Sequence, residues 1–410
     1  MSDRLDPDSA PAERTASRRD ALRALGMGLV GLPIAACATS APVEKPVVRL
    51  VSPRIPQPGF PPAASPDSLV VGDLPADSLA ADTLAGDVAV ADSVAVAPVP
   101  VQRALVLPRR IRPGGRIGLV APAGVLRSAS QVEEAAADMR AMGFETRVGR
   151  HALARYGPLA GTDQQRADDL MAMVADPDVD AVLCLRGGYG CARILPLLDF
   201  DAIRAAAKPI IGYSDVTALL LAVYARSRLV SFHGPVGVST WRGATAEAFR
   251  RVLVRGETLA VQGERRADRM SPETIRSGRA EGPLVGGNLS VVASLAGTGY
   301  LPGFDGHVVF LEEVGEESYR LDRLFTQLEQ AGVLRDPAAV VFGQCAQCSS
   351  GGSSWSAEDV LRDHLGGYRC PAWIGAPIGH VSPVYTLPVG LPVATDASAG
   401  TLEAVGPAVA

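Results

Sequence analysis

The sequence predicts an α/β protein with two folded domains: an N-terminal parallel sheet flanked by helices, then a second α/β domain. Between residues 116 and 222, apolar runs typical of buried strands alternate with helix-patterned segments, an order that gives parallel strands with right-handed crossovers. A second apolar unit begins at Gly282. With 410 residues, 47% of them hydrophobic, the chain can hold two cores beyond a leader segment.

The first 37 residues have the pattern of an export signal. The pair Arg18-Arg19 precedes a short, glycine-containing apolar stretch, which is too short for a membrane-spanning helix. With Leu22 after it, the pair resembles the twin-arginine export pattern, which serves proteins that fold before export. Residues 34–37 are similar to a bacterial lipobox, which implies lipidation of Cys37 and cleavage before it. The alternative is an ordinary signal peptide with a chance cysteine. We expect a periplasmic lipoprotein anchored to a membrane.

Residues 38–109 have the composition of a disordered tether. Proline and alanine dominate, and no Lys or Arg occurs between Arg54 and Arg103. The pattern Asp-Ser/Thr-Leu/Val recurs with a five-residue period, for example at Asp77 and Asp82, and this period fits neither a helix face nor strand alternation. Such a tether would let a lipid-anchored protein reach away from its membrane.

The first domain, 110–240, is read as alternating strands and helices. A capping box at Thr162 and Gln165 marks the start of its second helix. In order, we expect a strand at 116–124, a helix at 130–143, a strand at 144–149, a helix from 162, a strand and glycine loop at 181–190, a helix at 192–198, a strand at 208–215 and a helix to 222.

Residues 241–280 are polar and weakly periodic and read as a connection to the second domain, 281–410. Six cysteines are too few for a disulfide scaffold. Cys345 and Cys348 form a lone C-x-x-C, which favours unpaired strand-end cysteines over a disulfide, a redox pair or a zinc site. Cys184 lies in an apolar run and is expected in the core. The net charge of −5, with no stripe of Lys and Arg, argues against a nucleic-acid partner.

Two polar segments follow strands of the expected parallel sheet: the loop 186–190 and the pair Ser214-Asp215. Ligands on such sheets bind at the carboxyl ends of the strands, so both segments are expected at one cleft. Ser214 is either a nucleophile on a strand-to-helix elbow or a helix N-cap. The loop is not a phosphate loop, because no Gly-Lys-Ser/Thr follows it.

A serine nucleophile needs a base, a group that orients the base, and donors for the oxyanion. Of the five histidines, His380 and His233 are the two candidates for the base. Glu312 is the first carboxylate at the end of an apolar run and is well placed to orient an imidazole. An ordinary strand-end acid is the plainer interpretation, and Glu313 or Glu316 could serve instead.

Six blocks, in this order, resemble the LD-carboxypeptidases (muramoyltetrapeptide carboxypeptidases, the S66 serine peptidases). The resemblance covers the chain from about Ile111 to the C-terminus. The blocks are RGGYGCARILPLLDF, KPIIGYSDVTALLLA, SFHGPV, GPLVGGNLSVVASLAGT, FLEEVGEESYRLDRLFTQLEQAG and GHVSPVYTLPVG.

The resemblance implies a Ser–Glu–His triad and an active site at the interface of the two domains. The family's nucleophile falls on Ser214, its glutamate on Glu312 and its histidine on His380. Backbone N–H groups of the residue after the serine and of the glycine loop form the family's oxyanion hole. They fall here on Asp215 and on Gly188 or Gly187. Substrate contacts are expected from Tyr189, His233, Gly287 and Asn288.

The implied activity is hydrolysis of an L,D-amide, releasing terminal D-alanine from murein tetrapeptides through an acyl-enzyme. Neither a metal nor another cofactor is expected. The expected partners are murein peptides as substrate, a membrane through the lipid anchor, and a second copy of the chain in a homodimer. One alternative is a related hydrolase that cleaves another peptide or antibiotic-conjugate amide. The other is a non-catalytic envelope lipoprotein that binds murein.

Overall fold

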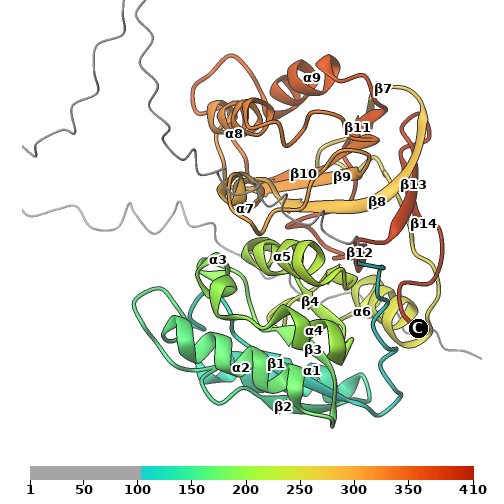
Figure 1. Ribbon diagram of the computed structural model, residues 1–410. Coiled ribbons are helices and arrows are strands. Elements are labelled where there is room, and N and C mark those ends of the chain that lie inside the picture. The colour runs from blue at the N-terminus through green and yellow to red at the C-terminus, as the bar shows by residue number, and fades with distance from the viewer. Residues whose placement is uncertain (1–102) are drawn as a thin grey trace, which may run out of the picture. The chain divides into compact units, whose positions relative to one another are not determined.

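The computed structural model describes residues 103–410, so the export signal, Cys37 and most of the tether lie outside the described residues. The described chain forms two lobes, each built on a sheet with helices packed around it (Figure 1). This confirms the predicted two-domain α/β fold. No helix within residues 103–410 is long and apolar enough to cross a membrane. Val106 already pairs with Leu229 of the first lobe, before the predicted start of the first domain at residue 110.

The first sheet has six strands in the order β12-β5-β4-β3-β1-β2. Its five N-terminal strands are mutually parallel, whereas β12 comes from the far end of the chain and pairs antiparallel with β5. The strands are β1 (Arg116–Val120), β2 (Glu145–Val148), β3 (Val179–Cys184), β4 (Ile210–Gly212), β5 (Ser231–His233) and β12 (Leu387–Val389).

The helices of the first lobe largely follow the sequence pattern. The capping box of α2 is present, with Thr162 accepting from the Gln165 N–H and Gln165 reaching back to the Thr162 N–H. The helix expected at 192–198 is shorter, because a 3-10 turn that contains Pro196 takes over at Leu195. The helices are α1 (Ala129–Ala141), α2 (Asp163–Ala175), α3 (Cys191–Ile194), α4 (Phe200–Ala206), which was not predicted, and α5 (Thr217–Ser227).

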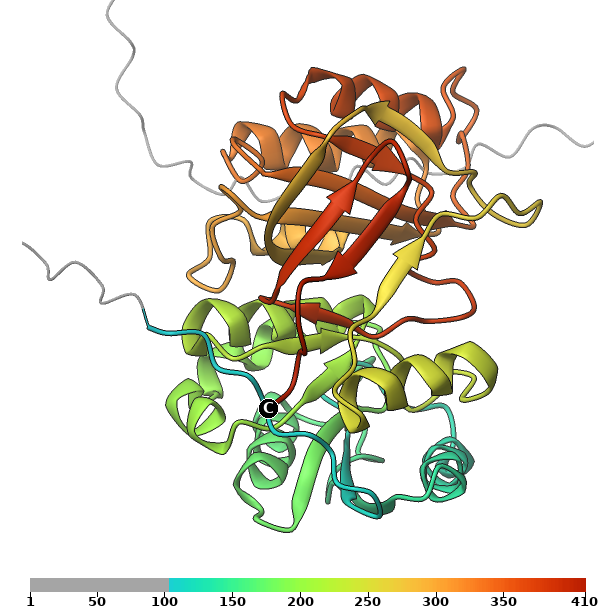
Figure 2. The ribbon, with the colours of Figure 1, turned by 90° about the vertical axis from the view of Figure 1, so that its right-hand side faces the viewer.

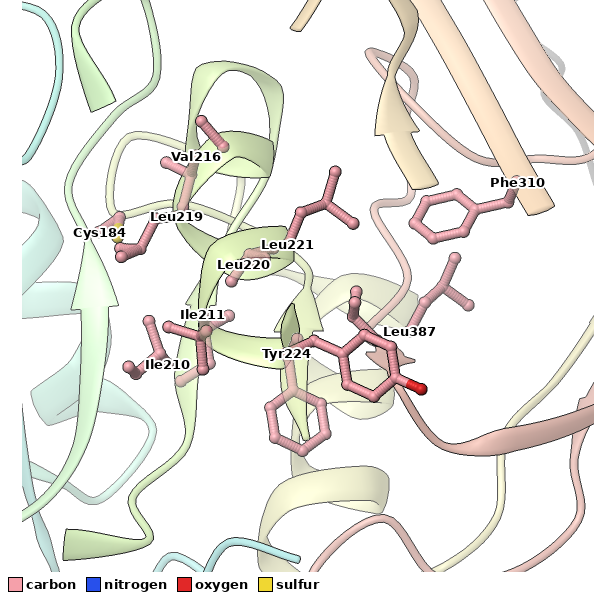
Figure 3. Packing of buried hydrophobic residues seen from close by; sticks show 14 of the residues in the cluster. Cys184, Ile210, Ile211, Val216, Leu219, Leu220, Leu221, Tyr224, Phe310 and Leu387 are labelled. Carbon is pink, nitrogen blue, oxygen red and sulfur yellow. The ribbon is translucent and has the colours of Figure 1, made fainter. Parts of the chain in front are cut away.

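Helix α5 lies between the two sheets and is buried along most of its length. Leu219 and Val216 lie on the side of Cys184, which is in the core as expected, whereas Leu221 lies nearer to Phe310 of the second lobe (Figure 3). Burying a leucine contributes about 1.5–3 kcal/mol, so α5 ties the two lobes into one core. The N-terminus of α5 is thereby fixed where the lobes meet.

The segment 241–280, expected as a connection between the domains, carries secondary structure of its own. It contains α6 (Gly243–Phe249), a π-helical turn (Arg250–Val254) and two strands, β6 (Ala260–Gln262) and β7 (Glu273–Arg276). These strands form the two edges of the second sheet. The segment reads as polar because edge strands expose one face, so the apolar pattern is weak.

The second sheet has eight strands in the order β6-β14-β13-β8-β9-β10-β11-β7. Its central strands β8 to β11 are parallel, and its outer strands are antiparallel. The remaining elements are β8 (Arg279–Asn288), α7 (Leu289–Leu295), β9 (Val308–Val314), α8 (Ser318–Gln330), β10 (Ala339–Ala346), α9 (Ala357–Gly367), β11 (Ala372–Ile374), β13 (Pro392–Asp396) and β14 (Thr401–Ala404).

One loop crosses from the second sheet to the first. Strand β11 belongs to the second sheet and β12 to the first, so residues 375–386 run from one lobe to the other (Figure 2). His380 lies on this loop. Cys345 and Cys348, expected to be unpaired, instead form a disulfide at the carboxyl end of β10. The sequence could not show this pairing, because it depends on the tight turn that follows the strand.

Candidate active site

Ser214 lies on a sharp turn between a buried strand and a buried helix. Strand β4 ends at Gly212, and a 3-10 turn (Ser214–Val216) leads directly into α5. Ser214 has a φ of +65°, in the left-handed region, which costs a residue with a side chain roughly 1–2 kcal/mol. Its side chain caps no backbone N–H of this turn, where Tyr213 is the N-cap residue. The absence of a capping hydrogen bond from Ser214 argues against the N-cap interpretation, and its left-handed backbone favours a nucleophile on a strand-to-helix elbow.

His380, on the loop between β11 and β12, forms a hydrogen-bonded pair with Glu312 of β9. The distance from His380 Nδ1 to Glu312 Oε2 is 2.8 Å. Glu312 is fully buried, and the His380 side chain is 20% exposed. Burial opposes a charge on the ring, but the hydrogen bond and the charge of Glu312 outweigh it and raise the pKa of His380. The pair has the geometry of an imidazole oriented by a carboxylate.

The backbone next to His380 can lie against Glu312 only because residue 379 is glycine. Its φ is +116°, and a Cβ there would lie 2.6 Å from Glu312 Oε2. The close approach lets the ring reach the carboxylate at the end of β9.

The two alternative carboxylates are engaged elsewhere. Glu313 accepts hydrogen bonds from Asn288 Nδ2 at 2.8 Å and from the Ser290 N–H at 2.8 Å. Glu316, which precedes α8, pairs with Arg320 in the first turn of that helix. Within the described part of the chain, only Glu312 among these three acids contacts a histidine.

His233, the other candidate base, is buried and lies against aromatic rings. Its ring centroid is 5.1 Å from that of Phe310 and 5.9 Å from that of Tyr213. Burial lowers the pKa of His233 to about 4, so the ring is neutral at pH 7. Neither ring nitrogen has a hydrogen-bond partner among the described residues. No carboxylate orients this ring, so it lacks the arrangement that His380 has.

Tyr213 is a site residue that the sequence reasoning missed. It directly precedes Ser214, and its ring centroid lies 4.9 Å from that of His380. Tyr213 therefore joins the elbow to the histidine loop. No hydrogen bond links Ser214 Oγ to His380 within residues 103–410. In the sequence, the one feature that could have indicated a role for Tyr213 is its place directly before Ser214 in the GYSD block.

The glycine loop packs directly against the elbow. A Cβ at Gly187 would lie 2.9 Å from Ser214 Oγ and 3.3 Å from the Asp215 nitrogen, so only glycine fits. The Asp215 carboxylate accepts the Cys191 N–H at 2.8 Å, which fixes the loop to the turn. The N–H groups of Asp215 and Gly188 donate to no acceptor within residues 103–410. Tyr189 is 57% exposed at the tip of the loop.

Asn288 and Gly287 lie at the carboxyl end of β8, beside β9. The Asn288 side chain caps α7 through the Val291 N–H and donates to Glu313, so it braces this edge. Gly287 packs against Thr217 at the start of α5. Both residues shape the boundary between the lobes near the elbow.

Two family models match the described chain. The LD-carboxypeptidase N-terminal domain matches residues 117–234, and the LD-carboxypeptidase C-terminal domain matches residues 281–394. The chain belongs to the LD-carboxypeptidase family. Together the two matched segments hold the elbow, the glycine loop, Glu312 and His380.

Relatives of known name fit this assignment. The murein tetrapeptide carboxypeptidase of Pseudomonas aeruginosa is 35% identical over 65% of this chain and 88% of its own length. The microcin C7 self-immunity protein of Escherichia coli is 29% identical over 58% of this chain and 77% of its own length. The solved muramoyltetrapeptide carboxypeptidase of Oxalobacter formigenes superposes with a TM-score of 0.62 at 28% identity. That alignment covers 70% of this chain and 97% of that one.

Proposed function

We propose that this LD-carboxypeptidase family member is a serine hydrolase that releases terminal D-alanine from murein tetrapeptides. The observation that carries the proposal is the pair His380–Glu312, joined at 2.8 Å. The His380 ring lies 4.9 Å from that of Tyr213, the residue before a serine on a left-handed elbow. A base, its orienting carboxylate and a nucleophile on a strand-to-helix turn are the parts that acyl transfer requires.

In the proposed reaction, Ser214 Oγ attacks the carbonyl carbon of the L,D-amide while His380 Nε2 takes its proton. The Nδ1–H of His380 donates to Glu312, which stabilises the imidazolium. The ring then gives the proton to the leaving D-alanine nitrogen, and water activated by the same ring hydrolyses the acyl-enzyme. Hydrogen bonds between nucleophile and base are often long without substrate, which accords with the geometry here.

The oxyanion is proposed to form beside Gly187, where two N–H groups have no acceptor in the described chain. The Asp215 N–H would provide one donor and the glycine loop, through Gly188 or Gly187, the other. Removing one such donor from an oxyanion hole typically costs about 10²–10³ in rate. The reaction as proposed needs no metal.

The proposed substrate is inferred from the names of the relatives. The Pseudomonas aeruginosa relative is named for murein tetrapeptides. The Escherichia coli relative is named for self-immunity to microcin C7, which favours hydrolysis of another peptide conjugate as the second candidate. Export by the twin-arginine route, lipidation of Cys37 and a homodimer remain proposals. An exported enzyme would trim peptides of the sacculus or its fragments in the periplasm.

The test is hydrolysis of monomeric muropeptides by the purified protein, followed by chromatography. Wild type should convert tetrapeptide to tripeptide plus D-alanine, and Ser214→Ala should not. Peptide–nucleotide conjugates run in parallel address the second candidate. Cleavage of the conjugates but not the tetrapeptide would replace the murein assignment. Binding without any cleavage would favour the non-catalytic lipoprotein.

A further inference from the structure

Arg269 is a buried cation beside the loop that carries His380. It lies between β6 and β7, in the segment that the sequence presents as a polar connection. Its side chain is only 5% exposed. In Figure 2 this segment and the loop before β12 lie on the same side of the molecule. Arg269 Nη2 donates to the carbonyl of Ser382, two residues after His380, at 2.9 Å.

The charge of Arg269 is incompletely matched by the protein. Its Nε is buried and makes no hydrogen bond within residues 103–410, although it lies 3.5 Å from Asp268 Oδ1. Asp268 is the one carboxylate within 4 Å in the described chain, at 3.5 Å, and its side chain is 61% exposed. Asp268 also pairs with Arg266 at 3.1 Å. Two guanidinium groups thus share one exposed carboxylate. A buried cation without a matched anion is costly, so the site favours an anionic ligand.

The segment that carries Arg269 is fixed to the histidine loop by further contacts. The Gln344 amide accepts the Met270 N–H at 2.8 Å and donates to the Ala376 carbonyl at 3.1 Å. A Cβ at Gly375 would lie 2.5 Å from the Ser271 carbonyl oxygen. Arg269 and the loop before His380 therefore form one packed unit, which holds the guanidinium at a defined place relative to the base.

We propose that Arg269 binds the terminal carboxylate of the substrate. The inference rests on the proposed carboxypeptidase function, in which the scissile carbonyl lies one residue before a free carboxylate. One residue of extended peptide spans about 3.5 Å, so the two ends of the leaving D-alanine need a base and a cation close together. Arginine presents a planar fork of donors that matches a carboxylate. The hydrogen bond from Nη2 to Ser382 places the guanidinium beside the loop that carries His380, where the leaving residue would lie.

The experiment compares two substrates that differ only at the terminal group. One is the tetrapeptide ending in D-alanine, and the other is the same peptide ending in D-alaninamide. Tripeptide release gives kcat/KM for both. Arg269→Gln removes the charge and Arg269→Lys keeps it. Arg266→Gln is the matched control, because Arg266 shares Asp268 but is exposed on the same segment.

Wild type and Arg266→Gln should prefer the acid over the amide by about 10- to 150-fold, the range expected for a hydrogen bond to a charged group. Arg269→Gln should reduce that preference to within about threefold, and Arg269→Lys should give an intermediate ratio. An unchanged acid/amide ratio in Arg269→Gln overturns the proposal, whatever the absolute rate, because a loop brace would slow both substrates equally. If Arg269→Gln does not fold, the ratio for Arg269→Lys decides in the same way.

The same experiment separates this inference from the proposed function. Wild type that cleaves acid and amide equally refutes the carboxylate site and leaves the hydrolase assignment standing. Wild type that cleaves neither peptide refutes the proposed function, and the role of Arg269 is rejected with it.

Discussion

Replacing Glu312 by glutamine tests its proposed role as the carboxylate that orients the base. Glutamine keeps the size of the side chain but removes the charge that His380 Nδ1 contacts at 2.8 Å. A hydrogen bond to a buried charged group contributes about 1.5–3 kcal/mol, which alone corresponds to about 10- to 150-fold in rate. The loss of ring orientation adds to this, so we expect kcat/KM to fall by about 10²–10⁴-fold.

The pH profile of Glu312→Gln has a defined direction. Glu312 raises the pKa of His380, and the base works only as the neutral ring, so wild-type activity rises with pH through that raised pKa. Without the carboxylate the pKa falls, so the acidic limb of kcat/KM moves to lower pH while the plateau drops. D-Alanine release measured from pH 5 to pH 9 gives both quantities.

Glu313→Gln is the matched control, because Glu313 is the adjacent buried acid and contacts Asn288 instead of His380. Glu313→Gln should lower the free energy of unfolding, and its kcat/KM should fall by less than about tenfold. A Glu312→Gln variant within fivefold of wild type, or a Glu313→Gln variant with the larger loss, would refute the assignment of the acid.

The remaining predictions concern the elbow, a buried histidine and the leader. Ser214→Gly should unfold with a free energy about 1 kcal/mol above that of Ser214→Ala in urea titrations, because φ at this position is +65°; equal values would contradict the strain. The lowered pKa of His233 means that the unfolded ring takes up a proton between pH 6.5 and about 4 while the folded ring does not. Stability should therefore fall by up to about 3 kcal/mol as pH falls through that window. In His233→Phe the free energy of unfolding should depend less on pH over this window, and the same slope as in wild type would contradict the role of His233. Radiolabelled palmitate should label the wild type and not Cys37→Ser, and normal export after changing Arg18 and Arg19 to Lys would exclude the twin-arginine route.

The fold could be predicted where the sequence pattern is local. The alternation of apolar runs and helices marked the strands of the first sheet, and Thr162 with Gln165 marked the start of α2. The antiparallel pairing of β12 with β5 could not be predicted, because the two short strands are far apart in sequence and no local pattern marks their contact. The short strands β6 and β7 were missed because they lie at the edges of the second sheet, where one exposed face weakens the apolar pattern.

The sequence allowed the residues of the candidate site to be predicted, but fewer of the contacts between them. Ser214, Glu312 and His380 stand in recognisable blocks, and the structure brings Glu312 to His380 at 2.8 Å. Sequence alone left Glu313 and His233 open, because only three-dimensional packing shows that each is committed elsewhere. Arg269 gave no signal, since a charge in a polar stretch usually lies in solvent and its burial depends on the loop from β11 to β12.

A double-mutant cycle tests most directly whether Ser214 and His380 act as one catalytic unit. The values of kcat/KM for D-alanine release are measured for wild type, Ser214→Ala, His380→Ala and the double variant, with His233→Ala alongside. The account predicts equally severe losses for both single variants, a double variant no worse than either, and a milder loss for His233→Ala. Near-wild-type rates for His380→Ala together with an inactive His233→Ala would contradict it.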